Sequence, residues 1–486
     1  MPDERDSGTD AGWKFDNSYA RLPETLFSRV APVPVRQPGL VLFNERLAAS
    51  LGLDVGALNG PEGAGIFAGN LVPPGAEPLA QAYAGHQFGH FTNLGDGRAV
   101  LLGEQITPTG ARFDIQLKGS GPTPYSRRGD GRAVLGPMVR EYIISEAMHA
   151  LGIPTTRSLA VATTGEPVFR EEALPGAVLT RVAASHVRVG TFEYATATGD
   201  RAALTALLAH TITRHYPELE GAENPALALL GAAASRQASL VARWMQVGFI
   251  HGVMNTDNMA LSGETIDYGP CAFMDAFDEA TVFSSIDRHG RYAYGNQPRI
   301  AQWNLARLAE GLLPLIAEKE EEAIRLAEGV LGKFADEFQG HWLEGFRSKL
   351  GLFTAEAGDE ALIRDLLALM KDSGADFTNT FIALAKGDTP EGGGWTAWMD
   401  RWKARLASQP QTESEVIARM RSVNPAVIPR NHRVEEALAA AMEGDFSKVQ
   451  RLVQVLSDPF AETMENEAFR KPPPSGGEPY RTFCGT

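Results

Sequence analysis

The sequence predicts an α+β protein of two lobes with an additional segment at each end. Between residues 98 and 183 its hydrophobic pattern gives the order strand, strand, helix, strand, strand. From residue 201 onward, long segments have helical periodicity instead. The chain has 486 residues, 44% of them hydrophobic and 22% charged, which is enough apolar material for a full core. We therefore expect a sheet-containing lobe followed by a helical one.

Local patterns define the elements of the first lobe. Residues 99–102 form an apolar run and residues 113–118 alternate with period two, so we predict two adjacent antiparallel strands. Residues 137–151 repeat apolar side chains at i, i+4 spacing and carry a proline in the first turn, which is typical of a helix. Two further apolar runs, 158–162 and 177–180, are predicted as strands.

Helices predominate in the second half of the chain, with one short β-prone interruption at 259–274. The last residues, 471–486, are dense in Pro and Gly, so we expect them to be mobile unless another segment holds them. Helical periodicity is found at residues 201–217, 226–249, 300–330 and 355–370.

Composition excludes several classes of protein. The 45 Lys and Arg against 60 Asp and Glu give a net charge of −15, which argues against a protein that coats nucleic acid or an anionic membrane. No secretory signal, transit peptide or membrane-spanning apolar stretch is readable, and two cysteines cannot cross-link a fold of this size. We expect a cytoplasmic monomer with neither nucleic acid nor membrane as its partner.

A hexapeptide, Gly-Asp-Gly-Arg-Ala-Val, occurs at residues 95–100 and again at 129–134. Such glycines let backbone N–H groups approach an anion while the arginine supplies charge. The alternative is a pair of ordinary turns with solvated arginines. Eleven Lys/Arg against eight Asp/Glu between residues 98 and 188 form a basic island in an acidic chain, which favours a polyphosphate ligand.

Lys118 ends the alternating strand, and the predicted helix carries Glu141 further along the chain. A strand lysine aimed at nucleotide phosphates and held by a helix glutamate is the ion pair that protein kinases use. A solvated surface lysine is the alternative for Lys118 when it is considered alone.

A second set of kinase-like residues follows the helix predicted at 226–249. His251 opens a loop that contains Asp257 and Asn258, and Asp267-Tyr-Gly comes shortly after it. This order matches a kinase catalytic loop and the metal-binding Asp-Phe-Gly that follows it. Asp257 is then the general base, while Asn258 and Asp267 chelate Mg²⁺ on the nucleotide phosphates. For His251 we favour a structural hydrogen bond to the loop backbone.

These motifs together predict a bilobal protein-kinase-like fold. Its expected segments are an N-terminal wrapping extension at 1–80, a kinase-like N-lobe at 81–185, a kinase-like C-lobe at 186–310, a helical extension at 311–470 and a flexible tail that carries a cysteine at 471–486.

The chain closely resembles the selenoprotein O (YdiU) family over nearly its whole length. That family was called pseudokinase because its loop lacks the usual Asp after His-Arg, and here Gly252 and Val253 follow His251. The segments that carry the resemblance are 84–90, 93–99, 116–121, 140–148, 251–259, 267–270 and 424–431.

The resemblance implies transfer of AMP from ATP to Ser, Thr or Tyr hydroxyls of proteins, with Mg²⁺, and it leaves uridylylation from UTP with Mn²⁺ open. It also implies that Asn258 and Asp267 hold the metal and that Asp257 accepts the proton. The nucleotide contacts that it implies are Gly95, Gly97, Arg98, Lys118, Asp130, Gly131, Arg181 and Arg188.

Two other functions fit the same residues. One is a kinase that transfers the γ-phosphate, and the other is a silent nucleotide-binding module that regulates a partner. The protein substrates leave no trace in the sequence.

The two cysteines occupy suggestive positions. Cys271 directly follows Asp267-Tyr-Gly-Pro270, and Cys484 is third from the end; in eukaryotic relatives this tail position is selenocysteine. We hypothesise a reversible disulfide that links the tail to the active site, since cytosolic disulfides tend to be regulatory. A buried Cys271 and an idle Cys484 are the alternative.

Overall fold

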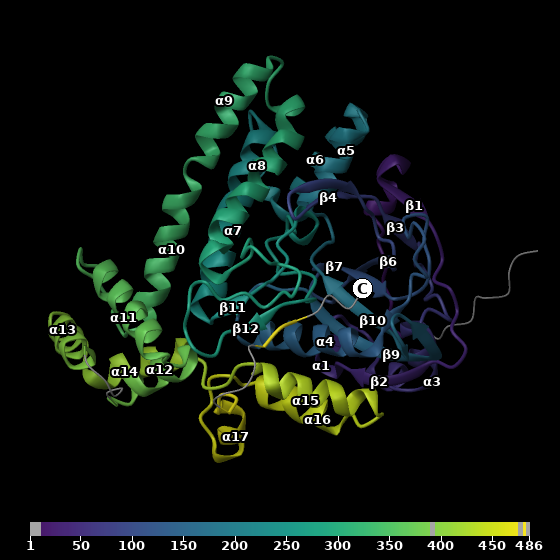
Figure 1. Ribbon diagram of the computed structural model, residues 1–486. Helices are drawn as coiled ribbons and strands as arrows, with labels where there is room; N and C mark the ends of the chain where they lie inside the picture. The colour runs from purple at the N-terminus through teal and green to yellow at the C-terminus, as the bar shows by residue number, and fades with distance from the viewer. Residues whose placement is uncertain (1–10, 389–393, 475–479, 483–486) are drawn as a thin grey trace, which may run out of the picture.

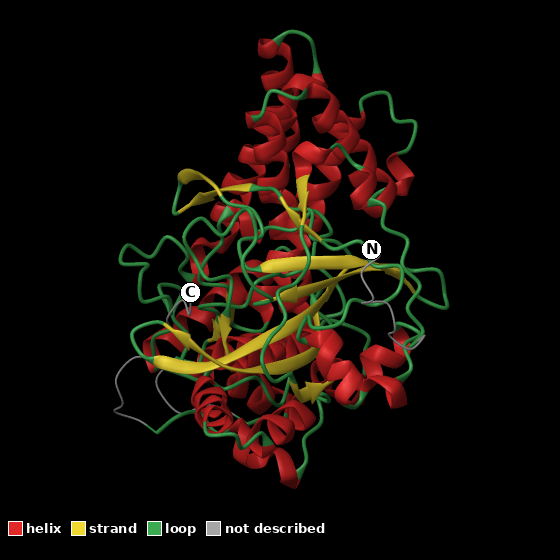
Figure 2. Cartoon of the chain, turned by 90° about the vertical axis from the view of Figure 1, so that its right-hand side faces the viewer, coloured by secondary structure: helices red, strands yellow, loops and turns green. Residues whose placement is uncertain are grey.

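The protein has a mixed α and β architecture in which one large sheet is followed by many helices (Figure 1). The computed structural model describes residues 11–388, 394–474 and 480–482. Figure 2 shows the sheet across the middle of the molecule, with helices above and below it. The predicted order of a sheet-containing region followed by a helical region is therefore confirmed.

The main sheet has eight strands in the order β1-β3-β6-β7-β10-β9-β2, with β8 paired to β10. All of its pairs are antiparallel. A separate hairpin, β4–β5, projects beside the sheet. The strands are β1 (Phe27–Arg29), β2 (Gly39–Phe43), β3 (Leu79–Gln81), β4 (Ala84–Gln87), β5 (His90–Asn93), β6 (Ala99–Ile106), β7 (Arg112–Lys118), β8 (Ala133–Val134), β9 (Arg157–Phe169) and β10 (Ala173–Ala183).

All four strands predicted between residues 98 and 183 are present, and the first two pair as expected. β9 and β10 are longer than their predicted apolar runs, because they pair with each other as a long hairpin, from Ala173 opposite Phe169 to Val182 opposite Arg157. Residues before 80 supply β1 and β3 next to β6 and place β2 at the opposite edge of the sheet.

The alternation of β7 separates an apolar face from a polar one. Ile115 and Leu117 pack with residues of the N-terminal helices in one buried cluster. Gln116 and Lys118 therefore face the other side, where Arg181 lies directly opposite Gln116 on β10. The predicted helix at 137–151 is α4, and it packs on β9 and β10.

Helices make up the remainder of the chain. Asp200 and Asn224 cap α6 and α7, each accepting a hydrogen bond from a first-turn amide. The helices are α1 (Glu45–Ser50), α2 (Val55–Leu58), α3 (Pro61–Phe67), α4 (Leu135–Ala150), α5 (Val189–Ala197), α6 (Arg201–His215), α7 (Pro225–Gln246), α8 (Gln297–Ile316), α9 (Glu320–Leu331), α10 (Phe334–Lys349), α11 (Asp359–Ser373), α12 (Phe377–Ala385), α13 (Trp395–Ala407), α14 (Glu413–Val423), α15 (Asn431–Met442), α16 (Ser447–Leu456) and α17 (Glu467–Arg470).

Two predictions of local structure need correction. The single helix expected at 300–330 is two helices, because α8 ends just after Pro314, which lacks an amide donor, and Ala317 is extended. The β-prone stretch at 259–274 is mostly loop and turn. Only Ala272–Phe273 forms a strand, β12, which pairs with β11 (Phe249–Ile250). No helix among the described residues is both long and apolar enough to span a membrane.

Lys349 is an unusual buried cation at the end of α10. It is 3% exposed, and its Nζ lies 4.0 Å from the centroid of the Phe381 ring. No carboxylate in the described part of the chain pairs with it. Burial lowers the pKa of Lys349 to about 7, because the cost of desolvating the ammonium exceeds the stabilisation that the cation–π contact provides.

Replacing Lys349 by Met should therefore stabilise the protein. An unfolded lysine has a pKa near 10.4, so between about pH 7 and pH 10 the unfolded chain holds more protons at this position. The free energy of unfolding of the wild type should rise across this interval. The Lys349→Met variant should be more stable than the wild type at pH 7 by about 1–3 kcal/mol. It should also lack the increase in the free energy of unfolding that Lys349 causes between about pH 7 and pH 10. Urea unfolding at pH 7 and pH 9 measures both quantities.

The exposed Lys403→Met on α13 is the matched control and should leave stability unchanged. A Lys349→Met variant that is less stable than the wild type would contradict the lowered pKa of Lys349. So would a variant whose free energy of unfolding keeps the full pH dependence of the wild type.

Candidate active site

A cleft of about 420 Å³ lies between the polar face of the sheet, α4 and the loops after β11. All twelve residues that the sequence assigned to catalysis, nucleotide, metal or their support contribute to its lining. Seven cationic and five acidic side chains line it among the described residues. The twelve residues assigned from the sequence are Gly95, Gly97, Arg98, Lys118, Asp130, Gly131, Glu141, Arg181, Arg188, Asp257, Asn258 and Asp267.

At the base of the cleft, Lys118 of β7 lies between two carboxylates. Its Nζ is 2.7 Å from Oε2 of Glu141 on α4 and also contacts Oδ1 of Asp267. Lys118 is 6% exposed and Glu141 is 2% exposed, so this is a buried ion pair and not a solvated surface lysine. The pairing predicted from a strand lysine and a helix glutamate is present.

Arg181 of β10 joins the same two carboxylates. Its Nε donates to Oε1 of Glu141 at 2.7 Å, and its Nη2 lies 3.1 Å from Oδ1 of Asp267. Burial would raise the pKa of Glu141, but Arg181 and Lys118 outweigh it and lower the pKa. Burial opposes ionisation of Asp267 too, and Lys118 and Arg181 nevertheless hold its pKa well below the usual range. Both carboxylates are therefore ionised at neutral pH.

Asp257 lies in a short 3₁₀ turn, Thr256–Asn258, and is 8% exposed. Burial raises its pKa to about 7, with Arg188 acting in the opposite direction. Its Oδ1 has no hydrogen-bond partner among the described residues. Gly85 of β4 packs against this carboxylate so closely that a Cβ there would lie 2.2 Å from Oδ1. A buried, unpaired carboxylate with a pKa near 7 suits a general base.

Asn258 and Asp267 face the cleft from consecutive loops. The Asn258 side chain donates to the carbonyl of Val253 at 3.0 Å, while its Oδ1 is buried and unpartnered in the described structure. An orphaned amide oxygen beside an ionised carboxylate is a fitting pair of ligands for Mg²⁺ or Mn²⁺. The described residues hold no cluster of three or more His, Cys, Asp or Glu suited to a metal, so such an ion would need further oxygens from phosphate or water.

His251 is fully buried below the loop, and its Nε2 lies 2.9 Å from the carbonyl oxygen of Ile266. This is the structural hydrogen bond favoured from the sequence. Gly252 has a φ of +81°, and a Cβ there would lie 2.4 Å from the carbonyl oxygen of Pro270. The contact requires glycine at the position after His251.

The two copies of the repeated hexapeptide line the same cleft but differ in their surroundings. Asp96 of the first copy is buried and accepts a hydrogen bond from Gln116 at 3.2 Å. Asp130 of the second is exposed and pairs with Arg170 at 2.9 Å. No carboxylate in the described ranges pairs with Arg98, so its charge is available to a ligand.

Arg188 enters the cleft from the segment that connects β10 to α5. It is 3% exposed, donates to the carbonyl of Asp257 at 3.0 Å, and stacks over Tyr83 with its Cζ 4.5 Å from the ring centroid. Its Nε has no partner in the described part of the chain. Tyr83, Asp96 and Gln116 were not identified from the sequence, because only tertiary packing brings them to the cleft.

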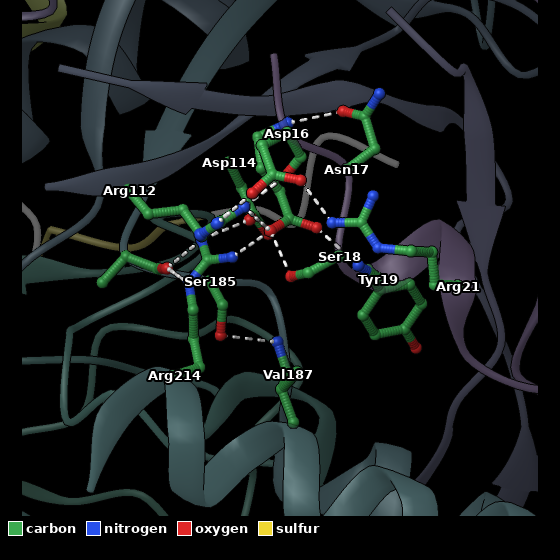
Figure 3. Close-up of polar contacts among 12 residues, drawn as sticks. Asp16, Asn17, Ser18, Tyr19, Arg21, Arg112, Asp114, Ser185, Val187 and Arg214 are labelled. Atoms are coloured by element: carbon green, nitrogen blue, oxygen red, sulfur yellow. Dashed lines mark hydrogen bonds and ion pairs between the residues drawn. The ribbon is translucent and has the colours of Figure 1, made fainter. Parts of the chain in front are cut away.

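A buried polar network behind the cleft fixes the position of this connecting segment (Figure 3). Asp114 accepts from Nη2 of Arg214 at 2.8 Å and from the backbone of His186 at 2.9 Å. Arg214 also donates from Nε to the carbonyl of Ala184 at 3.0 Å and pairs with Glu104. Burial would raise the pKa of Asp114, yet Arg214 and His186 lower it to about 2.

The N-terminal segment completes this network. Glu104 accepts from the Ser18 hydroxyl and the Tyr19 amide, each at 2.5 Å, and Asp16 pairs with Arg112 at 2.5 Å. Figure 3 shows these side chains converging from the N-terminal segment, the sheet and the connecting segment. No local pattern in the sequence indicated this network.

Cys271 lies next to the cleft but does not line it. It is fully buried, and burial raises the pKa of its thiol to about 12. Cys484 lies outside the described residues. The described end of the tail is nevertheless held, because the Thr482 hydroxyl donates to the carbonyl of Pro270 at 2.7 Å.

Comparison with known proteins gives a consistent result. A family model described as "Protein adenylyltransferase SelO" matches residues 11–457. The "Protein nucleotidyltransferase YdiU" of Brevibacillus brevis is 63% identical over 481 residues, which are 98% of each chain. Proteins of the same name from Halalkalibacterium halodurans and Geobacillus kaustophilus are 62% and 61% identical, over 98% of this chain and 98% and 100% of theirs.

The polar network leads to a prediction about stability. Replacing Arg214 by Met leaves Asp114 and Glu104 buried with fewer positive charges, so the free energy of unfolding should fall by about 3–5 kcal/mol. Residues 184–188 should also lose protection against amide hydrogen exchange. The exposed Arg201→Met on α6 is the control. Unchanged stability and unchanged exchange in Arg214→Met would contradict this role.

Proposed function

The chain belongs to the SelO family and is a protein nucleotidyltransferase, and we propose that it transfers AMP from ATP to Ser, Thr or Tyr hydroxyls of proteins. The observation that carries the proposal is the buried network of Lys118, Glu141, Arg181 and Asp267 at the base of a cationic cleft. UMP transfer from UTP is the related alternative.

The charge of the cleft suits pyrophosphate as the leaving group. Attack at the α-phosphorus releases pyrophosphate, which develops more charge than the ADP released by a kinase. Lys118, Arg181 and Arg188 are all at most 6% exposed, so their attraction for phosphate is weakly screened. We assign contacts with the rest of the nucleotide to Arg98, Asp130, Gly95, Gly97 and Gly131, which line the same cleft.

The transfer step uses Asp257 as the proton acceptor. The oxygen of the acceptor hydroxyl forms a bond to the α-phosphorus while the bond from that phosphorus to the oxygen bridging to the β-phosphorus breaks. The hydroxyl proton passes to the Asp257 carboxylate, and pyrophosphate leaves with the bridging oxygen. A pKa near 7 lets Asp257 accept the proton at neutral pH and release it afterwards.

Asn258 and Asp267 would hold the divalent cation, Mg²⁺ or Mn²⁺. When bound, the ion offsets phosphate charge and helps to orient the nucleotide. The unpartnered Oδ1 of Asn258 supports this assignment.

We also propose that the fold is a bilobal, protein-kinase-like one with extensions at both ends. The supporting features are a strand lysine paired with a helix glutamate, and a loop with Asp257 and Asn258 that precedes Asp267-Tyr-Gly. The boundaries assigned from the sequence, 1–80, 81–185, 186–310, 311–470 and 471–486, belong to this proposal.

ATP labelled separately at the α- and γ-phosphates tests the activity. Label should enter protein from the α-phosphate only, and Lys118→Ala and Asp267→Ala should each lower the rate by at least 100-fold, since each removes charge from the phosphate site. Exposed Lys403→Ala is the control. Label from the γ-phosphate would indicate a kinase, binding without transfer would indicate a silent module, and normal labelling by either variant would refute its assigned role.

We further propose that Cys271 and Cys484 form a reversible disulfide. The Thr482 hydroxyl is hydrogen-bonded to the carbonyl of Pro270, the residue before Cys271, and Cys484 follows Thr482 by two positions in the sequence. A disulfide such as oxidised glutathione would accept the two electrons and two protons released as the sulfur–sulfur bond forms. In the cytoplasm, where thiols are normally reduced, such a disulfide would regulate the enzyme in response to oxidation.

Oxidised and reduced wild-type protein should therefore transfer AMP at different rates, because the bond ties the tail beside Pro270. Cys484→Ser should transfer at one rate under both conditions. A non-reducing digest of the oxidised wild type should contain the cross-linked peptide. Equal wild-type rates, or absence of that peptide, would refute the disulfide.

A further inference from the structure

A cluster of arginine and aromatic side chains lies beside the catalytic loop but outside the nucleotide cleft. We call Phe91, Arg291, Trp303 and Arg307 the arginine–tryptophan cluster. None of them lines the cleft. They come from the β4–β5 hairpin, from the loop before α8 and from α8 itself. Figure 1 shows β4 near α5 and α8, above the sheet.

Trp303 is the centre of the cluster. The Cζ of Arg291 lies 4.8 Å from its ring centroid, and the Cζ of Arg307 lies 4.9 Å from it. The His86 ring meets Trp303 edge-on at 5.3 Å and meets Phe91 at 5.5 Å. Two cations are thus held against one indole by stacking.

The charge of Arg291 is not neutralised. No carboxylate among the described residues pairs with its guanidinium, and its Nε is buried without a hydrogen-bond partner there. The nearest acid in sequence, Asp287, is occupied by the backbone amides of Arg291 and Tyr292 at 2.9 and 2.8 Å. Exposed Arg288 adds a positive charge nearby in the sequence.

The other charges of the cluster are largely paired. Arg307 lies 2.7 Å from Glu310 on the same helix, and the buried Glu193 contacts His86. An exposed i, i+3 pair is worth little, so it leaves Arg307 available to a stronger partner. Of the two arginines in the cluster, Arg307 therefore has a carboxylate partner, and Arg291 has none among the described residues.

Residues next to the cluster contact the loop that holds the proposed general base. The His86 amide donates to Oγ1 of Thr256 at 2.7 Å, and Gly85 packs on the carboxylate of Asp257. From the other side, Tyr292 donates its hydroxyl to Oδ1 of Asn255 at 2.7 Å. A polypeptide whose hydroxyl reaches Asp257 would have its flanking residues close to this surface. Phe91 is 46% exposed and offers an apolar contact there.

We propose that the arginine–tryptophan cluster binds acidic residues that flank the acceptor hydroxyl of the protein substrate, which makes Arg291 a specificity-determining residue. Arginine recognises carboxylates through paired hydrogen bonds, and the indole fixes the guanidinium in place. This inference rests on the proposed function, because it names the class of acceptor for the same site. The acidic chain disfavours nucleic acid as the occupant.

Three peptides of equal length test the proposal, each with one threonine flanked by aspartates, by asparagines or by lysines. With α-labelled ATP, the aspartate peptide should have the lowest KM. Arg291→Gln should raise that KM about fivefold and leave the KM for ATP and the labelling of the asparagine peptide unchanged. Arg325→Gln on α9 is the matched control, because it removes an exposed arginine outside the cluster.

Charge reversal gives a result that a merely structural role would not produce. Arg291→Glu should label the lysine peptide better than the aspartate peptide, with thermal stability unchanged. Equal KM values for the three peptides in the wild type would overturn the proposal. So would an Arg291→Gln variant that loses labelling of all three peptides to the same extent.

Direct binding separates this proposal from the proposed function. Fluorescence anisotropy of the labelled aspartate peptide, measured in ATP without transfer, should show weaker binding to Arg291→Gln than to wild type. If that result is obtained while no peptide accepts AMP, the cluster stands as an acidic-peptide site and the proposed activity fails. Tighter binding of a single-stranded oligonucleotide than of the aspartate peptide would overturn the proposal.

Discussion

The buried contact between Lys118, Arg181, Glu141 and Asp267 is the interaction on which the rest of the site depends. Two cations and two carboxylates from three parts of the fold meet there; Lys118, Arg181 and Glu141 are buried, and the Asp267 side chain is 30% exposed to the cleft. Removing any one charge leaves an uncompensated charge in a poorly solvated place, which costs several kcal/mol. The sheet, α4 and the loop of Asp267 are therefore coupled electrostatically as well as by packing.

This coupling explains the alternation of the central strands. Ile115 and Leu117 on β7 fill the apolar core under the N-terminal helices, so Gln116 and Lys118 must face the cleft. The register of β10 then sets Arg181 opposite Gln116 on the same face. A shift of β7 or of β10 by one residue would turn that strand's cation, Lys118 or Arg181, into the apolar core and point its aliphatic side chains at the cleft.

Much of this could be predicted from the sequence, and the exceptions have a common physical cause. Lys118 and Glu141 stand out because they lie on strongly patterned elements, and Asp257, Asn258 and Asp267 stand out because they fall within short local motifs. Tyr83 and Gly85 belong to no motif that was assigned a role, and their partners Arg188 and Asp257 are distant in the sequence. Asp96 lies inside the repeated hexapeptide, but its contacts with Gln116 and Arg188 depend on the tertiary fold. The network around Arg214 was missed for the same reason. The break in the helix expected at 300–330 was missed because helical periodicity is present on both sides of it, and only residues 317–319 separate α8 from α9.

The non-glycine residues with positive φ lie in or next to the cleft that holds the charged network. Among the described residues, the non-glycine positions with positive φ are Phe88, Arg127 and Asp267. Arg127 and Asp267 line the cleft, and the amide of Phe88 donates to the side chain of Asn255, in the loop that contains Asp257, at 3.1 Å. An L-residue in this conformation costs on the order of 1 kcal/mol and persists only where its surroundings fix it. For Asp267 those surroundings are Lys118 and Arg181, so the ion pairs that set its charge also hold its backbone in the strained conformation that aims the carboxylate at the cleft.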